Sequence, residues 1–137
     1  MQADRLIYDA RSEIAALFNA GNPRQVAFSK NSTESLNIAI FGTLSPDDHV
    51  ISSVSEHNSV LRPLHYLQDQ GMQLSFLPID EKGRIQLDLI PSLIQKNTKA
   101  IVITHASNVS GNITDLHTVS DFCKKYNLML IVDASQT

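Results

Sequence analysis

Two uninterrupted apolar segments constrain the fold of this chain more than any other feature. They are AIVIT at residues 100–104 and LMLIV at residues 128–132. A strand that is apolar on both faces is buried on both faces, which is typical of parallel sheets covered by helices. With their flanks, the two segments predict strands over 100–106 and 128–134. Three further β-rich segments predict strands over residues 26–29, 49–55 and 74–79.

Helical patterns occupy the segments around these strands. Residues 2–20 place apolar side chains at the spacing of one helix face, namely Leu6, Ile7, Ala10, Ile14, Leu17 and Phe18. Further helices are predicted over residues 32–44, 58–70, 87–95 and 115–126. The alternation of strand and helix predicts an α/β fold with a mostly parallel sheet and flanking helices. We expect residues 1–137 to form a single domain.

Composition excludes several functional classes. The chain has 137 residues, is 42% hydrophobic and carries a net charge of −3, so no basic surface for nucleic acid is expected. No apolar run approaches the ~20 residues of a membrane span, and the charged N-terminus is unlike a signal peptide. Cys123 is the single cysteine, which excludes an internal disulfide, and we interpret it as a small core residue. We therefore expect a cytoplasmic protein without membrane or nucleic-acid partners.

Polar residues gather after four of the five predicted strands. These segments read SKNSTES, SSVSEHNS, THASNVSG and VDASQT, whereas the third strand runs into an ordinary turn, PIDEKGR. In open α/β sheets, ligands bind beyond the carboxyl ends of the strands. A ligand site is therefore predicted at this edge.

The first three polar segments each allow a functional and a structural interpretation. Asn31 can cap a helix, and the hydroxyls of Ser32 and Thr33 with the free N–H groups there would hold a phosphate; the alternative is a plain helix cap. His57 can face a ring-shaped ligand or move protons, or it can be a structural polar group. Asn108 can donate to a ligand oxygen or can form a turn.

Asp133 is the most informative residue. It follows five consecutive apolar residues, so its carboxylate is expected at the tip of a central strand, where an unpaired charge is costly. A protonated pyridine nitrogen would be a suitable partner, and a magnesium ion, as in a receiver domain, is the competing explanation. Gln136 would reach the same ligand.

Together these segments resemble the class V aminotransferase family, in its cysteine desulfurase and selenocysteine lyase branch. The resemblance runs from ARSEIAALFNA through NSTESLN, EHNSVLRPL and THASNVSG to VDASQT. It implies a pyridoxal-phosphate enzyme of fold type I. In that family, the positions of Ser32 and Thr33 bind phosphate, His57 stacks on the ring and moves protons, Asn108 and Gln136 contact the ring and its phenolic oxygen, and Asp133 pairs with the pyridinium nitrogen. Asn31 departs from the Gly that this turn often has.

The resemblance also predicts that the chain is a fragment, truncated at both ends. The family's cofactor-binding lysine and persulfide-carrying cysteine lie on segments that would follow Thr137, and none of the lysines present replaces that lysine. For the parent, the resemblance implies conversion of L-cysteine to L-alanine with sulfur passed to an enzyme persulfide, in a homodimer that serves a sulfur-acceptor protein. No metal site is predicted.

Selenocysteine lysis, transamination and epimerisation are alternative activities of the parent. A non-catalytic α/β module, such as a receiver domain, is the alternative from a different class. A receiver would need clustered acids after its first strand, where the chain offers only Glu34. We expect the isolated chain to be inactive.

Overall fold

Four parallel strands form the sheet in the order β2-β1-β3-β4. They are β1 (His49–Ser53), β2 (Gln73–Leu77), β3 (Thr98–Thr104) and β4 (Met129–Asp133). The registers pair Ser53 with Leu77 and Thr104 with Asp133, so the carboxyl ends of the strands lie along one edge. The computed structural model, which describes residues 2–137, thus confirms the predicted α/β class.

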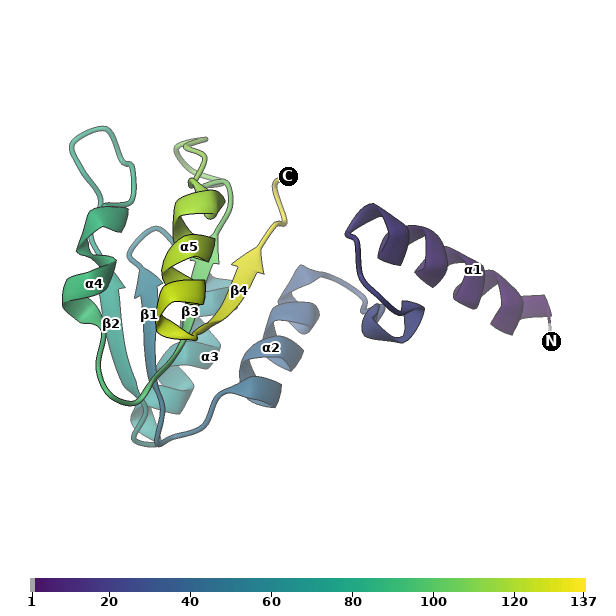
Figure 1. The fold of residues 1–137 in the computed structure, drawn as a ribbon, viewed down its shortest axis with the longest axis horizontal. Coiled ribbons are helices and arrows are strands. Elements are labelled where there is room, and N and C mark those ends of the chain that lie inside the picture. Colours follow the sequence, from purple (N-terminus) through teal and green to yellow (C-terminus); the bar gives the residue numbers. More distant parts are fainter. Residues whose placement is uncertain (1) are drawn as a thin grey trace. The chain divides into compact units, whose positions relative to one another are not determined.

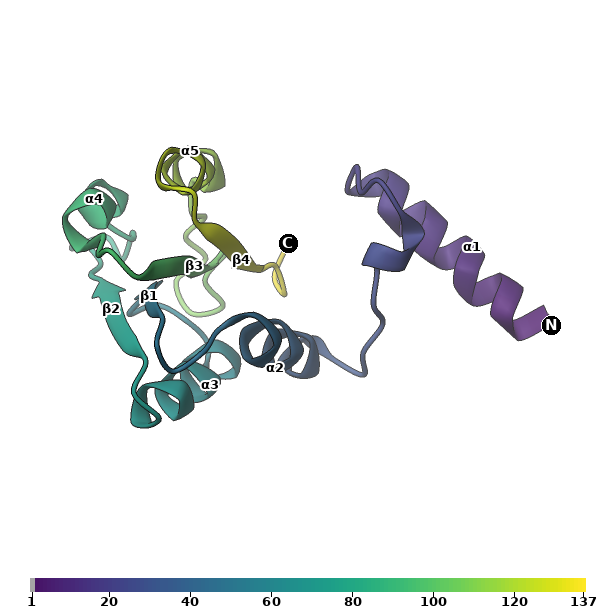
Figure 2. The same ribbon diagram turned by 60° about the horizontal axis from the view of Figure 1, so that its bottom comes forward.

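Helices cover both faces of this sheet, as Figure 2 shows. Helices α2 (Ser32–Thr43) and α3 (Asn58–Asp69) lie on one face, and α4 (Ile90–Leu93) and α5 (Leu116–Tyr126) lie on the other. Each face has its own apolar core. In β3, Ala100 and Val102 belong to the core under α2 and α3, whereas Ile101 and Ile103 belong to the core under α4 and α5. Burial on both faces explains why AIVIT is apolar without interruption.

Cys123 lies in the core under α5 and is 5% exposed. Burial raises the pKa of its thiol to about 11, so the thiol is a poor nucleophile at neutral pH. The interpretation of Cys123 as a small core residue is confirmed.

The point where the chain reverses its progress across the sheet lies between β1 and β3. From β1 the chain passes through α3 to β2 on one side, and then through α4 to β3 on the other side (Figure 1). Ligands of open α/β sheets bind beyond the carboxyl ends of strands at such a reversal. The topology therefore directs attention to the segments that follow β1 and β3.

Two predicted elements differ from the structure. Residues 26–29 form no strand: among the described residues, none pairs with them in a ladder. β-propensity is local, but a strand persists only with a hydrogen-bonded neighbour. The helix predicted over 87–95 is a 3-10 turn, η2 (Leu87–Leu89), followed by the short α4, because Pro91 has no N–H and starts a helix afresh.

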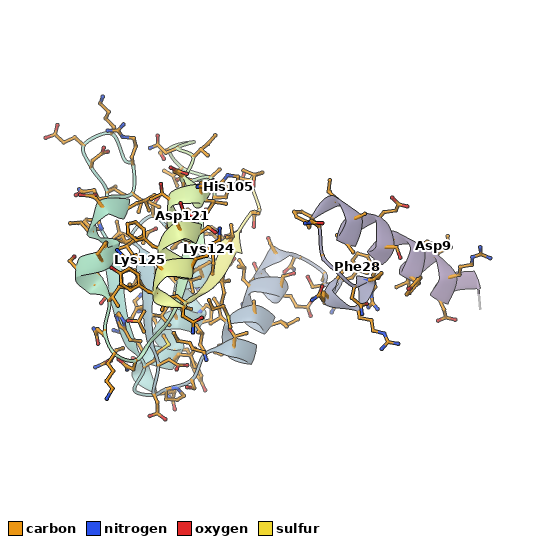
Figure 3. All side chains as sticks on the ribbon, viewed as in Figure 1. Asp9, Phe28, His105, Asp121, Lys124 and Lys125 are labelled. Carbon is orange, nitrogen blue, oxygen red and sulfur yellow. The ribbon has the colours of Figure 1, made fainter. Side chains whose placement is uncertain are left out.

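By its internal contacts the chain divides into two units, residues 1–30 and Asn31–Thr137. The first contains α1 (Gln2–Leu17) and the 3-10 turn η1 (Pro23–Gln25). Within this unit the Arg11 guanidinium lies 5.8 Å from the centre of the Phe28 ring, which Figure 3 labels. Leu6, Leu17 and Phe18, from the predicted apolar face of the helix, are exposed. The prediction of a single domain stays a prediction.

Candidate functional site

The beginning of α2 presents unbound backbone donors. The side chain of Asn31 caps this helix by accepting a hydrogen bond from the N–H of Glu34 at 2.9 Å. The N–H groups of Ser32 and Thr33, in the first turn, have no intrahelical carbonyl to bind. Such donors, together with the helix dipole, favour an anion at this position. The predicted cap is confirmed, and it leaves these two N–H groups and the Ser32 hydroxyl available, whereas the Thr33 hydroxyl is hydrogen-bonded to Ser59.

His57 caps α3 with its own imidazole ring. Its Nδ1 accepts a hydrogen bond from the N–H of Ser59 at 3.1 Å and lies 2.8 Å from the Ser59 hydroxyl. The Ser59 hydroxyl in turn lies 2.8 Å from Oγ1 of Thr33. A backbone N–H can only donate, so Nδ1 is unprotonated in this geometry and the neutral ring carries its proton on Nε2. Nε2 makes no hydrogen bond to any of the described residues.

Asp133 is the last residue of β4 and is 6% exposed. Its Oδ1 accepts hydrogen bonds from the N–H of Ser135 at 3.0 Å and from the Ser135 hydroxyl. These bonds turn the chain sharply beyond the strand, which places Gln136 beside the carboxylate in the same pocket. Asp133 lies at a strand tip as predicted, but β4 is the outer strand of the described sheet, so the expectation of a central strand was wrong.

The segment after β3 forms a turn around Ser107. Its hydroxyl accepts from the N–H groups of Val109 and Ser110, and Gly111 continues the turn with a φ of +70°. The side chain of Asn108 makes no hydrogen bond within the described part of the chain. Ser107, and not Asn108, therefore closes the turn, and the Asn108 amide remains available to a ligand.

Glu56 joins β1 to β3 at the reversal point of the sheet. Its Oε1 accepts from the Ser53 hydroxyl at 2.5 Å and from the Thr104 N–H at 3.0 Å, and its Oε2 is buried without a partner among the described residues. Burial, with a smaller contribution from the Asp133 charge, raises the pKa of Glu56 to about 7. Glu56 therefore links the ends of β1 and β3, and near pH 7 a substantial fraction of its carboxyl group is protonated.

One pocket of about 150 Å³ brings together all six of the predicted site residues. Asp133 is the only Asp, Glu, Lys or Arg side chain in its lining. The lining comprises Ser32, Thr33, His57, Ser59, Thr104, Ala106, Asn108, Asp133, Ser135 and Gln136. A buried carboxylate with only Ser135 as donor calls for a cationic ligand group, while the start of α2 on the same pocket favours an anion. The pocket can thus hold a ligand that carries charges of both signs.

The sequence did not identify Ser59, Glu56 or Ser135 at this site. Ser59 and Ser135 each lie two residues after a predicted site residue, a spacing at which a side chain or N–H can bind back to that residue. Their position next to His57 and Asp133 was the signal that could have found them. No such local signal exists for Glu56, because its partner Thr104 is distant in sequence.

The other histidines lie outside the pocket. His105, labelled in Figure 3, binds the Thr137 hydroxyl through Nδ1 at 2.9 Å, and its N–H donates to the Asp133 carbonyl. His49 is buried, and its ring binds Thr98 at 2.8 Å and Ser75 at 2.9 Å. The described residues contain no group of three His, Cys, Asp or Glu side chains that could hold a metal ion. Among them, no helix is long and apolar enough to cross a membrane.

The family match and the curated relatives of this chain point to the same family. The aminotransferase class-V family model matches residues 1–137. Cysteine desulfurase IscS of Pseudoalteromonas translucida is 31% identical over 99% of this chain, and that of Dictyoglomus turgidum is 34% identical over 96%. The chain covers 34% of the length of each, so it spans about a third of these curated relatives.

Solved structures give the same relationship. DndA from Streptomyces lividans superposes with a TM-score of 0.91 at 30% identity, covering 98% of this chain and 39% of its own. The cysteine desulfurase CsdA from Escherichia coli has a TM-score of 0.85 at 29% identity. The match covers 98% of this chain and 35% of the CsdA chain. A structure described as SspA in complex with cysteine has a TM-score of 0.91 at 28% identity. The match covers 99% of this chain and 40% of the SspA chain.

Proposed function

Because this chain belongs to the class V aminotransferase family, we propose that it forms the cofactor-binding part of a pyridoxal-phosphate enzyme of the cysteine desulfurase type. The whole enzyme would take sulfur from L-cysteine, release L-alanine and hold the sulfur as a persulfide. The curated relatives named above carry that activity in their names, and one similar structure holds cysteine. These likenesses support the reaction class.

The main support for the proposal is that the pocket offers N–H donors to an anion and a carboxylate to a cation. Pyridoxal phosphate combines an anionic phosphate with a pyridine ring whose nitrogen is a cation when protonated. The start of α2 offers free N–H groups to the phosphate, and Asp133 offers a buried carboxylate to the nitrogen. A bound cofactor with a protonated nitrogen supplies an electron sink for the substrate's α-carbon. The donors and the acceptor of the pocket fit this molecule.

Each site residue then has a role. Ser32 and Thr33 would bind the phosphate through hydroxyl and backbone groups, and Asp133 would hold the ring nitrogen. Asn108 and Gln136 would donate to the ring substituents. His57 would lie against the ring and exchange a proton at Nε2, because its Nδ1 is engaged by Ser59.

The pocket forms only a part of the proposed cofactor site. Its volume of about 150 Å³ is below the ~300–1,000 Å³ of typical small-molecule sites, and no lysine lines it. We propose that a lysine from elsewhere in the whole protein holds the cofactor, and that the protein is a homodimer that delivers sulfur to an acceptor protein.

The proposal predicts that Asp133→Asn weakens binding of the cofactor's ring. Pyridoxine 5′-phosphate is a suitable probe, since it lacks the aldehyde that would label surface lysines. We expect the probe to shift the amide resonances of Ser32, Thr33 and Asn108 in the chain. Asp133→Asn should weaken that binding at least ~10-fold, because a hydrogen bond to a charged group contributes roughly 1.5–3 kcal/mol.

Asp121→Asn is the matched control. Asp121 is exposed on α5, where it pairs with Lys124 and His117; Figure 3 labels Asp121 and Lys124. This variant should bind the probe as the original chain does. Equal affinities of the Asp133→Asn variant and the original chain, or resonance shifts clustered on another face, would contradict the proposal.

A further inference from the structure

Two turns lie beyond the carboxyl ends of β2 and β3, and only one of them lines the pocket (Figure 1). The turn over residues 106–113 follows β3, is closed by a bridge between its end residues, and carries Asn108 into the pocket. The turn over residues 79–85 follows β2, is closed in the same way, and contributes nothing to the pocket lining. From its sequence, IDEKGRI, it is an ordinary solvent turn. Its contacts with the first turn point to a further role.

The turn over residues 79–85 is held firmly by Asp80. Oδ1 of Asp80 accepts hydrogen bonds from the N–H groups of Lys82 at 2.8 Å and Arg84 at 2.9 Å, and Oδ2 accepts from Nε of Arg84 at 2.8 Å. Gly83 completes the turn with a φ of +74°, where a residue with a side chain would be strained. These bonds fix the position of the Lys82 carbonyl group.

Asn112 joins the two turns. Its side-chain nitrogen donates a hydrogen bond to the Lys82 carbonyl at 2.9 Å, across 30 positions of sequence. A Cβ atom at Gly83 would lie 3.1 Å from the same nitrogen. The space between the turns has a volume of about 10 Å³, no more than one water molecule needs. The two turns are therefore in direct contact at Asn112.

The backbone of Asn112 belongs to the turn that carries Asn108. Its carbonyl accepts a hydrogen bond from the N–H of Ser107 at 3.0 Å, and its N–H donates to the Ser110 hydroxyl at 3.3 Å. Asn108 directly follows Ser107, and its side chain has no hydrogen bond of its own within the described part of the chain. The direction of the Asn108 amide therefore depends on how firmly this turn is held.

We propose that Asn112 is a positioning residue, which holds the turn over residues 106–113 against the turn over residues 79–85 and thereby fixes the Asn108 amide in the pocket. The inference rests on the proposed function, which assigns Asn108 to the substituents of the cofactor ring. A ring that binds to an ordered turn meets its donor in place, so binding has to order fewer groups. Asn112 acts on the ring only through Asn108.

The test combines NMR relaxation with binding of pyridoxine 5′-phosphate to the chain. In Asn112→Ala, the order parameters of residues 107–111 should fall from about 0.85 toward about 0.6, the values of rigid and flexible backbone. Asn108→Ala should weaken binding of the probe by roughly 3–10-fold, as expected for one net hydrogen bond, and Asn112→Ala by roughly 2–3-fold. Added to Asn108→Ala, the second exchange should weaken binding no further, because its effect passes through Asn108.

Asn97→Ala is the matched control. The Asn97 side chain also ties two turns together, since it donates to the Asp47 carbonyl at 3.0 Å and to Gln73 at 3.1 Å. These residues lie at the amino ends of the strands, opposite the pocket. Asn97→Ala should therefore lower the free energy of unfolding at least as much as Asn112→Ala does, while the order of residues 107–111 and the affinity for the probe stay unchanged. A merely stabilising role of Asn112 would make the two variants alike.

The remaining outcomes separate the inference from the proposed function. If Asn112→Ala leaves the order of residues 107–111 unchanged, or weakens binding equally with and without the Asn108 side chain, the positioning role is wrong and the cofactor site stands. If the probe shifts none of the amide resonances of the pocket, the proposed function fails and the positioning role fails with it. Asn112→Asp keeps the shape of the side chain but lacks the N–H donor, so it gives a second reading if Asn112→Ala loses the dispersed amide spectrum of the fold.

Discussion

At the residue scale, Glu56 is a buried carboxyl group whose ionisation lowers the stability of the fold. Glu56 is 7% exposed, and its carboxyl group accepts hydrogen bonds from both Ser53 and Thr104. Its pKa is raised from 4.5 to about 7, mainly because burial disfavours the ionised form. The folded state therefore binds a proton more tightly than the unfolded state does between these two pH values.

This shift predicts a pH-dependent stability that Glu56→Gln removes. Because the folded pKa is the higher one, stability is lost as pH rises from about 4.5 to about 7 and stays reduced above that. Between pH 5 and pH 8, Glu56 should lower the free energy of unfolding by roughly 2–3 kcal/mol relative to the Gln variant. Urea unfolding at both pH values measures this difference.

Glu81→Gln, on the exposed turn after β2, is the control and should follow the original chain at both pH values. If the Glu56→Gln and original curves run parallel with pH, Glu56 does not hold its proton in the fold.

Glu56 is also a site residue that the sequence did not predict. The polar strand ends predicted six of the ten residues that line the pocket, since alternation of strand and helix brings such ends together at one end of the sheet. Glu56 meets the Thr104 N–H across 48 positions, and nothing local in SEHNS distinguishes it from a solvated acid. Ser59 likewise needs the packing of α3 beside α2 before its hydroxyl reaches Thr33.

At the scale of elements, continuous apolar runs predicted the buried strands well and residues 26–29 wrongly. β3 is apolar because helices cover both faces of the sheet there, whereas β4 is the outer strand of the described sheet, with Met129 37% exposed and only Ile131 and Asp133 buried. Residues 26–29 have β-propensity without a partner strand among those described, so propensity alone misled. Pro91 divided the predicted helix over 87–95, a restriction that the apolar spacing did not reveal.

His49 links three strands and gives a test at this scale. Its ring binds Ser75 of β2 and Thr98 of β3 from a buried position in β1. His49→Ala would leave a cavity and two hydroxyl groups without their partner, which predicts a loss of about 2–4 kcal/mol in the free energy of unfolding. Chemical denaturation measures the loss.

Because His49 begins β1, it lies at the opposite end of the strand from the pocket. Amide resonances of Ser32, Asn108 and Ser135 should therefore stay in place in folded His49→Ala. The exposed His117→Ala on α5 should cost less than about 0.5 kcal/mol. An equal loss in the two variants would show that the strand links contribute little.

At the scale of the whole molecule, the chain carries the pocket but no amine within it. The described sheet unit places acceptors and donors for a cofactor around one edge, and both apolar cores that support this edge come from residues beyond Asn31. None of the lysines lines the pocket. Binding must then rely on non-covalent contacts, which have to offset the lost translational and rotational freedom of the ligand.

We therefore expect the 137-residue chain to bind pyridoxal phosphate weakly and to release no sulfide from cysteine. Incubation with the cofactor, reduction with borohydride and mass spectrometry should give scattered labelling of surface lysines, such as the exposed Lys124. The labelling pattern should match that of Asp133→Asn, because surface amines do not depend on the pocket. A single stoichiometric adduct that disappears in Asp133→Asn, together with sulfide release above that of free cofactor, would show that one of these lysines does reach the pocket and that the chain is active by itself.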